Sequence, residues 1–84
     1  MIQNLDVYPN PTSGEFFVNF QSEEIQNIEI KLINTIGEII YFENLGKFIG
    51  EHTHKFNLSD YSKGIYFLEI ETNDGVINKK LILQ

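Results

Sequence analysis

The two histidines are the side chains of this chain best suited to bind a metal ion, and they stand two residues apart as His52 and His54. Residues two apart on a strand point to the same face, so both imidazole rings could reach one ion. Such a site needs a third ligand, and the neighbouring Glu51 would point to the opposite face. We therefore interpret both histidines as exposed surface residues, and we predict no metal site and no cofactor.

Paired carboxylates are the next candidates for chemistry, because Glu69 and Glu71 would share one strand face about 7 Å apart. A general acid needs a pKa raised by burial, which an open sheet face does not supply. The sequence has no cysteine nucleophile, its serines lie outside a G-x-S-x-G turn, and it lacks a phosphate-binding or dinucleotide-binding glycine motif. We predict that the chain is not an enzyme and has no catalytic residue.

Strands, rather than helices, must position these side chains. The 84 residues suffice for one domain, and we predict a single domain over residues 1–84. The chain contains no alanine but thirteen isoleucines, seven phenylalanines and four tyrosines. Alanine is the best helix former, whereas β-branched and aromatic residues favour strands. The composition therefore predicts an all-β fold.

Alternating apolar and polar residues predict about seven short antiparallel strands, a pattern typical of a β-sandwich or a β-barrel. Turn residues separate the strands at 9–14, at 34–37 and at the hairpin 73–75. Residues 59–64 predict one short helical turn. Residues 24–32 also fit helical spacing, but their alternating isoleucines favour a strand. The predicted strands are 5–7, 16–20, 28–32, 38–43, 54–58, 65–72 and 76–83.

The aromatic residues divide between a predicted core and a predicted surface. Inward parity predicts a core that contains Phe16, Phe20, Phe56, Tyr66 and Leu68. The hydroxyl of Tyr66 would bond to the backbone of residues 58–61, as in a tyrosine corner. Outer faces would carry Phe17, Phe42 and Phe67, where rings could stack on sugars or be covered by a partner domain.

The net charge of −6 opposes partners that require clustered positive charge. Nucleic-acid backbones and anionic lipid surfaces both attract Lys and Arg, so we predict no nucleic-acid partner. The longest apolar runs are far shorter than the roughly 20 residues of a membrane-spanning helix, so we predict no membrane span. Residues 1–4 lack the features of a signal peptide, and we expect the natural chain to continue upstream.

Four motifs occur in order along the chain: Val7-Tyr8-Pro9-Asn10-Pro11, residues 34–40, residues 56–68 and residues 78–83. Together, and over essentially the whole chain, they resemble the type A C-terminal sorting domain of the type IX (Por) secretion system of Bacteroidota. Asn34 and Lys63 depart from the family, which usually has Asp at the first position and often Pro or Ala at the second. The matching positions are Pro9, Asn10, Pro11, Gly37, Gly64, Tyr66, Lys79, Lys80 and Leu81.

The resemblance implies a fold, a role and partners. The fold would be an immunoglobulin-like antiparallel β-sandwich of about seven strands. The domain would follow an upstream cargo domain in a larger exported protein, fold in the periplasm, and be recognised by the type IX outer-membrane translocon. A sortase-like peptidase at the surface would usually remove it and join the cargo to an anionic lipopolysaccharide. The chain would thus be a non-catalytic sorting signal of a secreted or cell-surface protein.

The last predicted strand suggests how such a signal could be read. Lys79 and Lys80 precede an apolar end, Leu81-Ile82-Leu83, and a receptor could recognise this strand by strand addition. Two other functions remain open. One is a carbohydrate-binding module that would use exposed rings such as Phe17 and Tyr41, and the other is a structural spacer in a secreted hydrolase.

Overall fold

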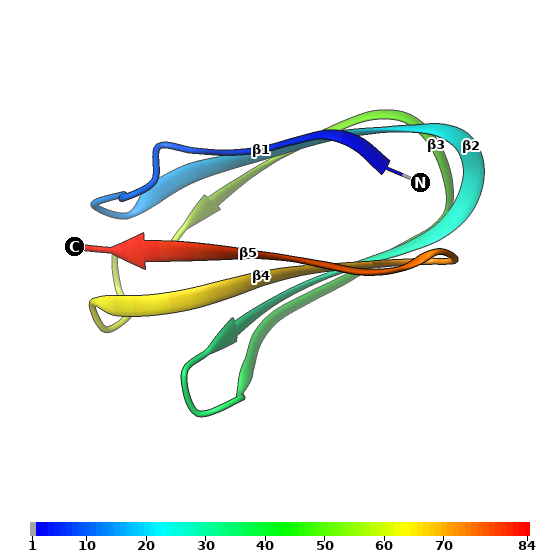
Figure 1. Cartoon of the computed structure of the whole chain (residues 1–84). Coiled ribbons are helices and arrows are strands. Elements are labelled where there is room, and N and C mark those ends of the chain that lie inside the picture. The colour runs from blue at the N-terminus through cyan, green and yellow to red at the C-terminus, as the bar shows by residue number, and fades with distance from the viewer. Residues whose placement is uncertain (1) are drawn as a thin grey trace.

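Alternating β-branched and aromatic residues form five antiparallel strands in the computed structural model, which describes residues 2–84 (Figure 1). They join in one sheet in the order β1-β2-β4-β5, and β3 pairs with the other edge of β2. The all-β prediction is confirmed. Among residues 2–84, no helix has the length and hydrophobicity that crossing a membrane requires. The strands are β1 (Ile2–Tyr8), β2 (Glu15–Asn34), β3 (Ile39–Asn57), β4 (Gly64–Thr72) and β5 (Gly75–Leu83).

The long strands β2 and β3 determine the shape of the sheet. The first part of β2 pairs with β1 and its last part with β4, whereas β3 pairs with β2 on both sides of a bend. Both strands turn back midway, at the right of Figure 1, so that the β1 half of the sheet faces the β4–β5 half. The register between β2 and β3 shifts between Ser22 and Gln26. An irregularity of this kind concentrates the bending of a strand at one point of the ladder.

Buried polar side chains support this bend. Ser22 and Gln26 are only 1% and 3% exposed. The Nε2 atom of Gln26 donates to Ser22 Oγ at 3.0 Å, and Ser22 Oγ donates to the Glu24 carbonyl at 2.7 Å. The hydroxyl therefore satisfies a backbone group at a place where the ladder is irregular.

The prediction of about seven strands is wrong, because two expected connections are bends within single strands. The predicted strands 16–20 and 28–32 are parts of β2, and 38–43 and 54–58 fall in β3 except for Glu38 and Leu58. The polar residues between these segments continue the strands, so local polarity did not mark a chain reversal. An immunoglobulin-like sandwich consists of two packed sheets, whereas these strands form one continuous curled sheet. The sandwich therefore stays a prediction.

The segment before β4 also differs from its prediction, because residues 59–64 do not form a helical turn. The Tyr61 N–H donates to the Leu58 carbonyl at 2.9 Å and closes a single turn. The Ser59 N–H donates to Asn57 Oδ1 at 2.9 Å. Local side-chain bonds of this kind compete with helix formation.

The core lies between the two facing halves and follows the predicted alternation. Tyr66 and Phe56 are each 5% exposed, as expected of core residues. Complete burial of one such apolar side chain contributes about 1.5–3 kcal/mol. Inner-face residues with exposed fractions of 0–1% are Phe16, Val18, Phe20, Ile28, Ile30, Leu32, Leu68, Ile70 and Leu81.

Tyr66 also makes the expected bond to upstream backbone. Its hydroxyl donates to the carbonyl of Ser62, one residue beyond the predicted range 58–61. This bond ties the first residues of β4 to the connection that precedes them, as a tyrosine corner does in other β proteins.

Candidate functional site

The four sequence motifs meet at one end of the sheet, on the left in Figure 1. Loop 9–14 joins β1 to β2 there, turn 34–38 joins β2 to β3, and segment 58–63 joins β3 to β4. Residues 80–84 end at the same side. We call these four segments together the motif end.

Asn10 connects loop 9–14 to the last strand. Its Nδ2 atom donates to the Lys80 carbonyl at 2.8 Å, and its Oδ1 atom accepts from the Ile82 N–H at 3.0 Å. Pro9 and Pro11 flank it, and both of their preceding peptide bonds are cis. The asparagine amide thus takes the place of a neighbouring strand along the outer edge of β5.

Thr12 extends this contact and is a functional candidate that sequence reasoning missed. Its N–H donates to the Ile82 carbonyl at 2.9 Å, and the Gln84 N–H donates to the Thr12 carbonyl at 2.8 Å. Thr12 and Leu83 form an isolated parallel bridge, and Thr12 is only 3% exposed. The sequence marks residues 9–14 as a turn, but no local signal indicates that the turn pairs with a strand about 70 residues away.

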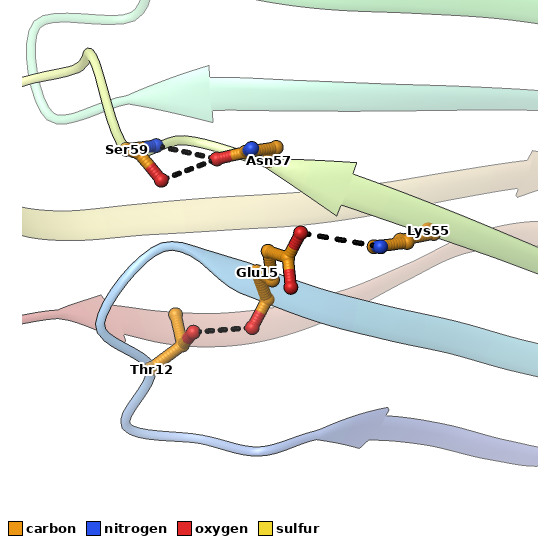
Figure 2. Close-up of polar contacts among 5 residues, drawn as sticks. All are labelled: Thr12, Glu15, Lys55, Asn57 and Ser59. Carbon is orange, nitrogen blue, oxygen red and sulfur yellow. Dashed lines mark hydrogen bonds and ion pairs between the residues drawn. The ribbon is translucent and has the colours of Figure 1, made fainter.

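Loop 9–14 is also fixed on its other side, as Figure 2 shows. Thr12 Oγ1 donates to the Glu15 carbonyl at 2.6 Å, and the Glu15 carboxylate lies 3.1 Å from the Lys55 ammonium of β3. Gly14 packs so closely that a Cβ atom there would lie 2.5 Å from Ser59 Oγ. The loop is therefore held between β5 and the segment that follows β3.

Lys79 and Lys80 lie on opposite faces of β5, because adjacent strand residues alternate. Lys79 pairs with Leu68 on the core face, whereas Lys80 pairs with Phe67 on the outer face. Both lysines are exposed, and among residues 2–84 neither takes part in an ion pair. Leu81, the next motif residue, is fully buried. The strand end thus combines an anchored apolar side chain with two solvated cations.

Asn34 organises turn 34–38, where Gly37 lies. Its Oδ1 atom accepts from the N–H groups of Ile36 at 3.2 Å and Glu38 at 2.9 Å. Its Nδ2 atom donates to the Glu38 carboxylate at 2.9 Å. Gly37 has a φ of 87°, which glycine adopts without a steric penalty. An aspartate at position 34 would keep both acceptor bonds, so this departure from the family preserves the turn.

A shallow groove of about 420 Å³ lies between turn 34–38 and the start of β4. Gly64 and Tyr66 line it from the β4 side. Ile36 and Tyr61 also line it and are 79% and 45% exposed. The groove therefore presents apolar surface beside two of the motif segments.

The two glutamates on β4 form a solvated strand face, as predicted. Glu69 and Glu71 alternate with buried Leu68 and Ile70. The Glu71 carboxylate lies 3.7 Å from the Lys31 ammonium of β2. An ion pair across an open sheet face is an ordinary surface feature.

The histidines, in contrast, are not the exposed surface residues that the sequence predicted. Both are partly buried on the inner face of β3. Glu43, from the other end of the same strand, approaches them, with 3.6 Å between its Oε1 atom and His54 Nδ1. Sequence reasoning missed Glu43 because only the bend of β3 brings it back to the histidines.

The two rings proposed for sugar stacking, Phe17 and Tyr41, lie in different surroundings. Phe17 stacks on Tyr8 of β1 with ring centroids 5.6 Å apart, and Tyr8 is 44% exposed. Tyr41 instead packs against Phe56, with centroids 4.9 Å apart, and its hydroxyl donates to Glu43. Tyr41 is therefore partly buried on the inner face rather than exposed on an outer face.

A family model described as "Secretion system C-terminal sorting domain" matches residues 6–84. The match spans all four motifs and every segment of the motif end, so it does not depend on one short signature. Among curated proteins, no relative matches the chain. With its motif residues gathered at one end of a curled sheet, the chain belongs to this family and is a C-terminal sorting domain of type IX secretion.

Proposed function

We propose that this sorting domain is a non-catalytic signal whose motif end is recognised by the outer-membrane translocon of type IX secretion. Family membership implies a type IX secretion partner and a secreted or cell-surface cargo protein. The observation that supports the choice of surface is the contact of Asn10 with Lys80, 70 residues apart, beside the other motif segments. One receptor could contact all of them without unfolding the domain.

The motif end offers two kinds of recognition element. One is the pair of exposed cations on the two faces of β5, Lys80 in the motif end and Lys79 directly before it. The other is the apolar groove beside turn 34–38. A receptor with acidic side chains and an apolar projection would complement both elements.

Strand addition, in this proposal, is limited to the first part of β5, which lies outside the motif end. Asn10 and Thr12 already occupy the outer edge at residues 80–84. The two-residue period of a strand directs the backbone groups of Val76 and Asn78 to the same edge. Among residues 2–84 these groups have no backbone partner on that side, so a receptor strand would pair there.

The later steps follow from the resemblance. A sortase-like peptidase at the surface would remove the domain and join the upstream cargo to an anionic lipopolysaccharide. The domain would be the substrate of this step and would supply no reacting group. Mass spectrometry of the exported cargo tests this, because a cargo that retains residues 1–84 at the surface contradicts removal.

An export assay tests the sorting role directly. Residues 1–84 are fused behind a signal peptide and a fluorescent protein in a host with a working type IX system. Fluorescence at the surface or in the medium that is lost in a translocon-deficient strain supports the proposal. Fluorescence that stays in the periplasm of the working host, with the domain folded and intact, contradicts it.

A charge-matched pair of variants tests the terminal lysines. Deleting residues 76–84 would remove Leu81 from the core and unfold the domain, so it cannot separate folding from recognition. The double variant Lys79→Gln and Lys80→Gln keeps the core, and we expect it to reduce export. The control, Lys31→Gln with Lys47→Gln, makes the same charge change on β2 and β3, outside the motif end. Equal export of both double variants would show that the terminal lysines are not read.

Carbohydrate binding is the second candidate function, and the stacked pair Tyr8 and Phe17 is the observation that favours it. Two rings at this spacing on an outer face could hold a sugar ring by stacking. Saturable binding to a polysaccharide array, lost in Phe17→Ala, would support it. An array without binding would remove this candidate.

A further inference from the structure

β3 brings a carboxylate and both histidines together, because the strand turns back on itself. Glu43 lies in the part of β3 that pairs with the second half of β2, opposite Ile30. His52 and His54 lie in the part that pairs with the first half of β2. One potential ligating atom from each of the three residues lies within 4.8 Å of the other two.

His52 provides the observation that points to a ligand. Its Nε2 atom is buried, and within residues 2–84 no group forms a hydrogen bond with it. The rings of Phe20 and Phe48 flank the imidazole, with centroids 5.3 and 5.6 Å away. A buried nitrogen without a partner is costly, and few such groups occur in native proteins.

Tyr41 holds the carboxylate in place. Its hydroxyl donates to Glu43 Oε1 at 2.7 Å, and His54 Nδ1 lies 3.6 Å from the same oxygen. Outer hydrogen bonds of this kind orient ligating carboxylates in metal sites.

A polar cluster without a metal explains part of this geometry. It accounts for the approach of His54 to Glu43, which becomes an ion pair when His54 is protonated. It leaves His52 Nε2 without a partner among the described residues. We propose that Glu43, His52 and His54 together bind one divalent transition-metal ion of the zinc class. This site goes beyond the sorting function and does not depend on it.

The ligand set suits zinc. Two imidazoles and one carboxylate are typical zinc ligands, and a water molecule can complete a tetrahedron. Bonds of about 2.0–2.2 Å place tetrahedral ligand atoms roughly 3.3 Å apart. The 3.6 Å between His54 Nδ1 and Glu43 Oε1 is close to this value. The three potential ligand atoms lie within 4.8 Å of one another, and side-chain rotations of Glu43 and His52 can bring them to the tetrahedral separation. A bound ion would link the two parts of β3 and stabilise the curl of the sheet.

A Zn²⁺ titration of the chelator-treated 84-residue chain tests the proposal, read by calorimetry and by NMR of the imidazole groups. His52 and His54 are the only histidines, so every imidazole signal reports on this site. We expect one ion per chain, shifts of both rings, and a thermal midpoint that rises with Zn²⁺ concentration. Absence of heat together with unchanged imidazole signals overturns the proposal.

Two matched variants separate ligation from general charge attraction. Glu43→Gln removes the carboxylate ligand but keeps an acceptor for Tyr41. Loss of an outer-shell partner typically lowers metal affinity by about 10- to 100-fold, and we expect a larger fall in Zn²⁺ affinity here. Glu51→Gln removes the same charge beside His52, but Glu51 is exposed on the opposite face, and affinity stays unchanged. Equal affinities of Glu43→Gln and Glu51→Gln overturn the proposal.

Tyr41→Phe tests the outer hydrogen bond. We expect Zn²⁺ affinity to fall about 10-fold, because the carboxylate loses the group that orients it. The imidazole shifts at saturating Zn²⁺ remain those of the wild-type chain. A variant that no longer binds Zn²⁺, although it unfolds at the wild-type temperature under chelation, would make Tyr41 itself a ligand and overturn the assigned set.

Discussion

The motif end and the Glu43–His52–His54 cluster are both rich in polar groups, but they are built in opposite ways. At the motif end, Asn10 and Thr12 bond to the backbone of β5, and turn and strand groups satisfy one another. In the cluster, the ionisable groups come together on a partly buried inner face, and the buried nitrogen of His52 lacks a partner among residues 2–84.

The polar groups of the motif end hold the structure together, whereas those of the cluster retain the capacity to bind a ligand. Satisfied hydrogen bonds at the motif end hold the sheet edge and leave the exposed side chains and the apolar groove for a receptor. An unsatisfied buried group in the cluster is a cost that a ligand could remove. Variants at the two regions should therefore differ in what they change, stability at the first and ligand affinity at the second.

The largest effect on stability is expected from the apolar anchor of the motif end. Leu81→Ala should lower the free energy of unfolding by about 2–5 kcal/mol, because Leu81 is fully buried and its removal leaves a cavity. Denaturant unfolding measures this. The control Lys80→Ala, on an exposed neighbour, should stay within about 0.5 kcal/mol. Similar losses in both variants would contradict the anchoring role.

The next effect concerns the contact between loop 9–14 and β5. Asn10→Ala removes two hydrogen bonds and should cost about 1–3 kcal/mol, at the usual contribution of about 0.5–1.5 kcal/mol each. Hydrogen exchange of the Ile82 amide should accelerate, because that amide donates to Asn10. Asn78→Ala, on the same strand, is the control. Unchanged protection of Ile82 would show that the loop does not close the edge.

A smaller effect is expected from the hydroxyl of Tyr66. Tyr66→Phe keeps the buried ring and removes the bond to Ser62, which should lower stability by about 1 kcal/mol. Tyr61→Phe changes an exposed hydroxyl nearby and should have no measurable effect. Thermal unfolding of both variants tests this, and equal midpoints would argue against the tyrosine corner.

The smallest effect is expected from the cluster in the absence of metal. Glu43→Gln, under chelation, should change the free energy of unfolding by less than about 0.5 kcal/mol, because partly exposed ion pairs contribute little. With Zn²⁺ present, the wild type should gain stability and the variant should not. A large loss under chelation would mean that the cluster already stabilises the fold without a metal.

Much of the fold could be predicted because it depends on local rules. The alternation of Phe16, Phe20 and Leu68 assigns each to the inner face, and all three are buried. Turn 34–38 and the hairpin after Thr72 follow from residues that favour those backbone conformations.

The bend of β2 could not be predicted in the same way. Ser22 and Gln26 are polar, and polar residues between apolar runs usually indicate a surface connection. Here they are buried and bonded to each other where the strand bends, so the strand continues. The count of strands failed at this point, because local polarity cannot distinguish a bend from a chain reversal.

The sequence by itself determined the apolar segments of the strands, the inward parity of the core residues it named, and where the turns at Gly37 and Gly75 lie. Its motifs also indicated the sorting family. Only the tertiary structure decided that β2 and β3 curl, that Asn10 closes the edge beside Lys80, and that Glu43 meets the histidines. The physical reason is that local periodicity specifies backbone conformation and face, whereas contacts between distant residues depend on how the whole sheet bends and packs.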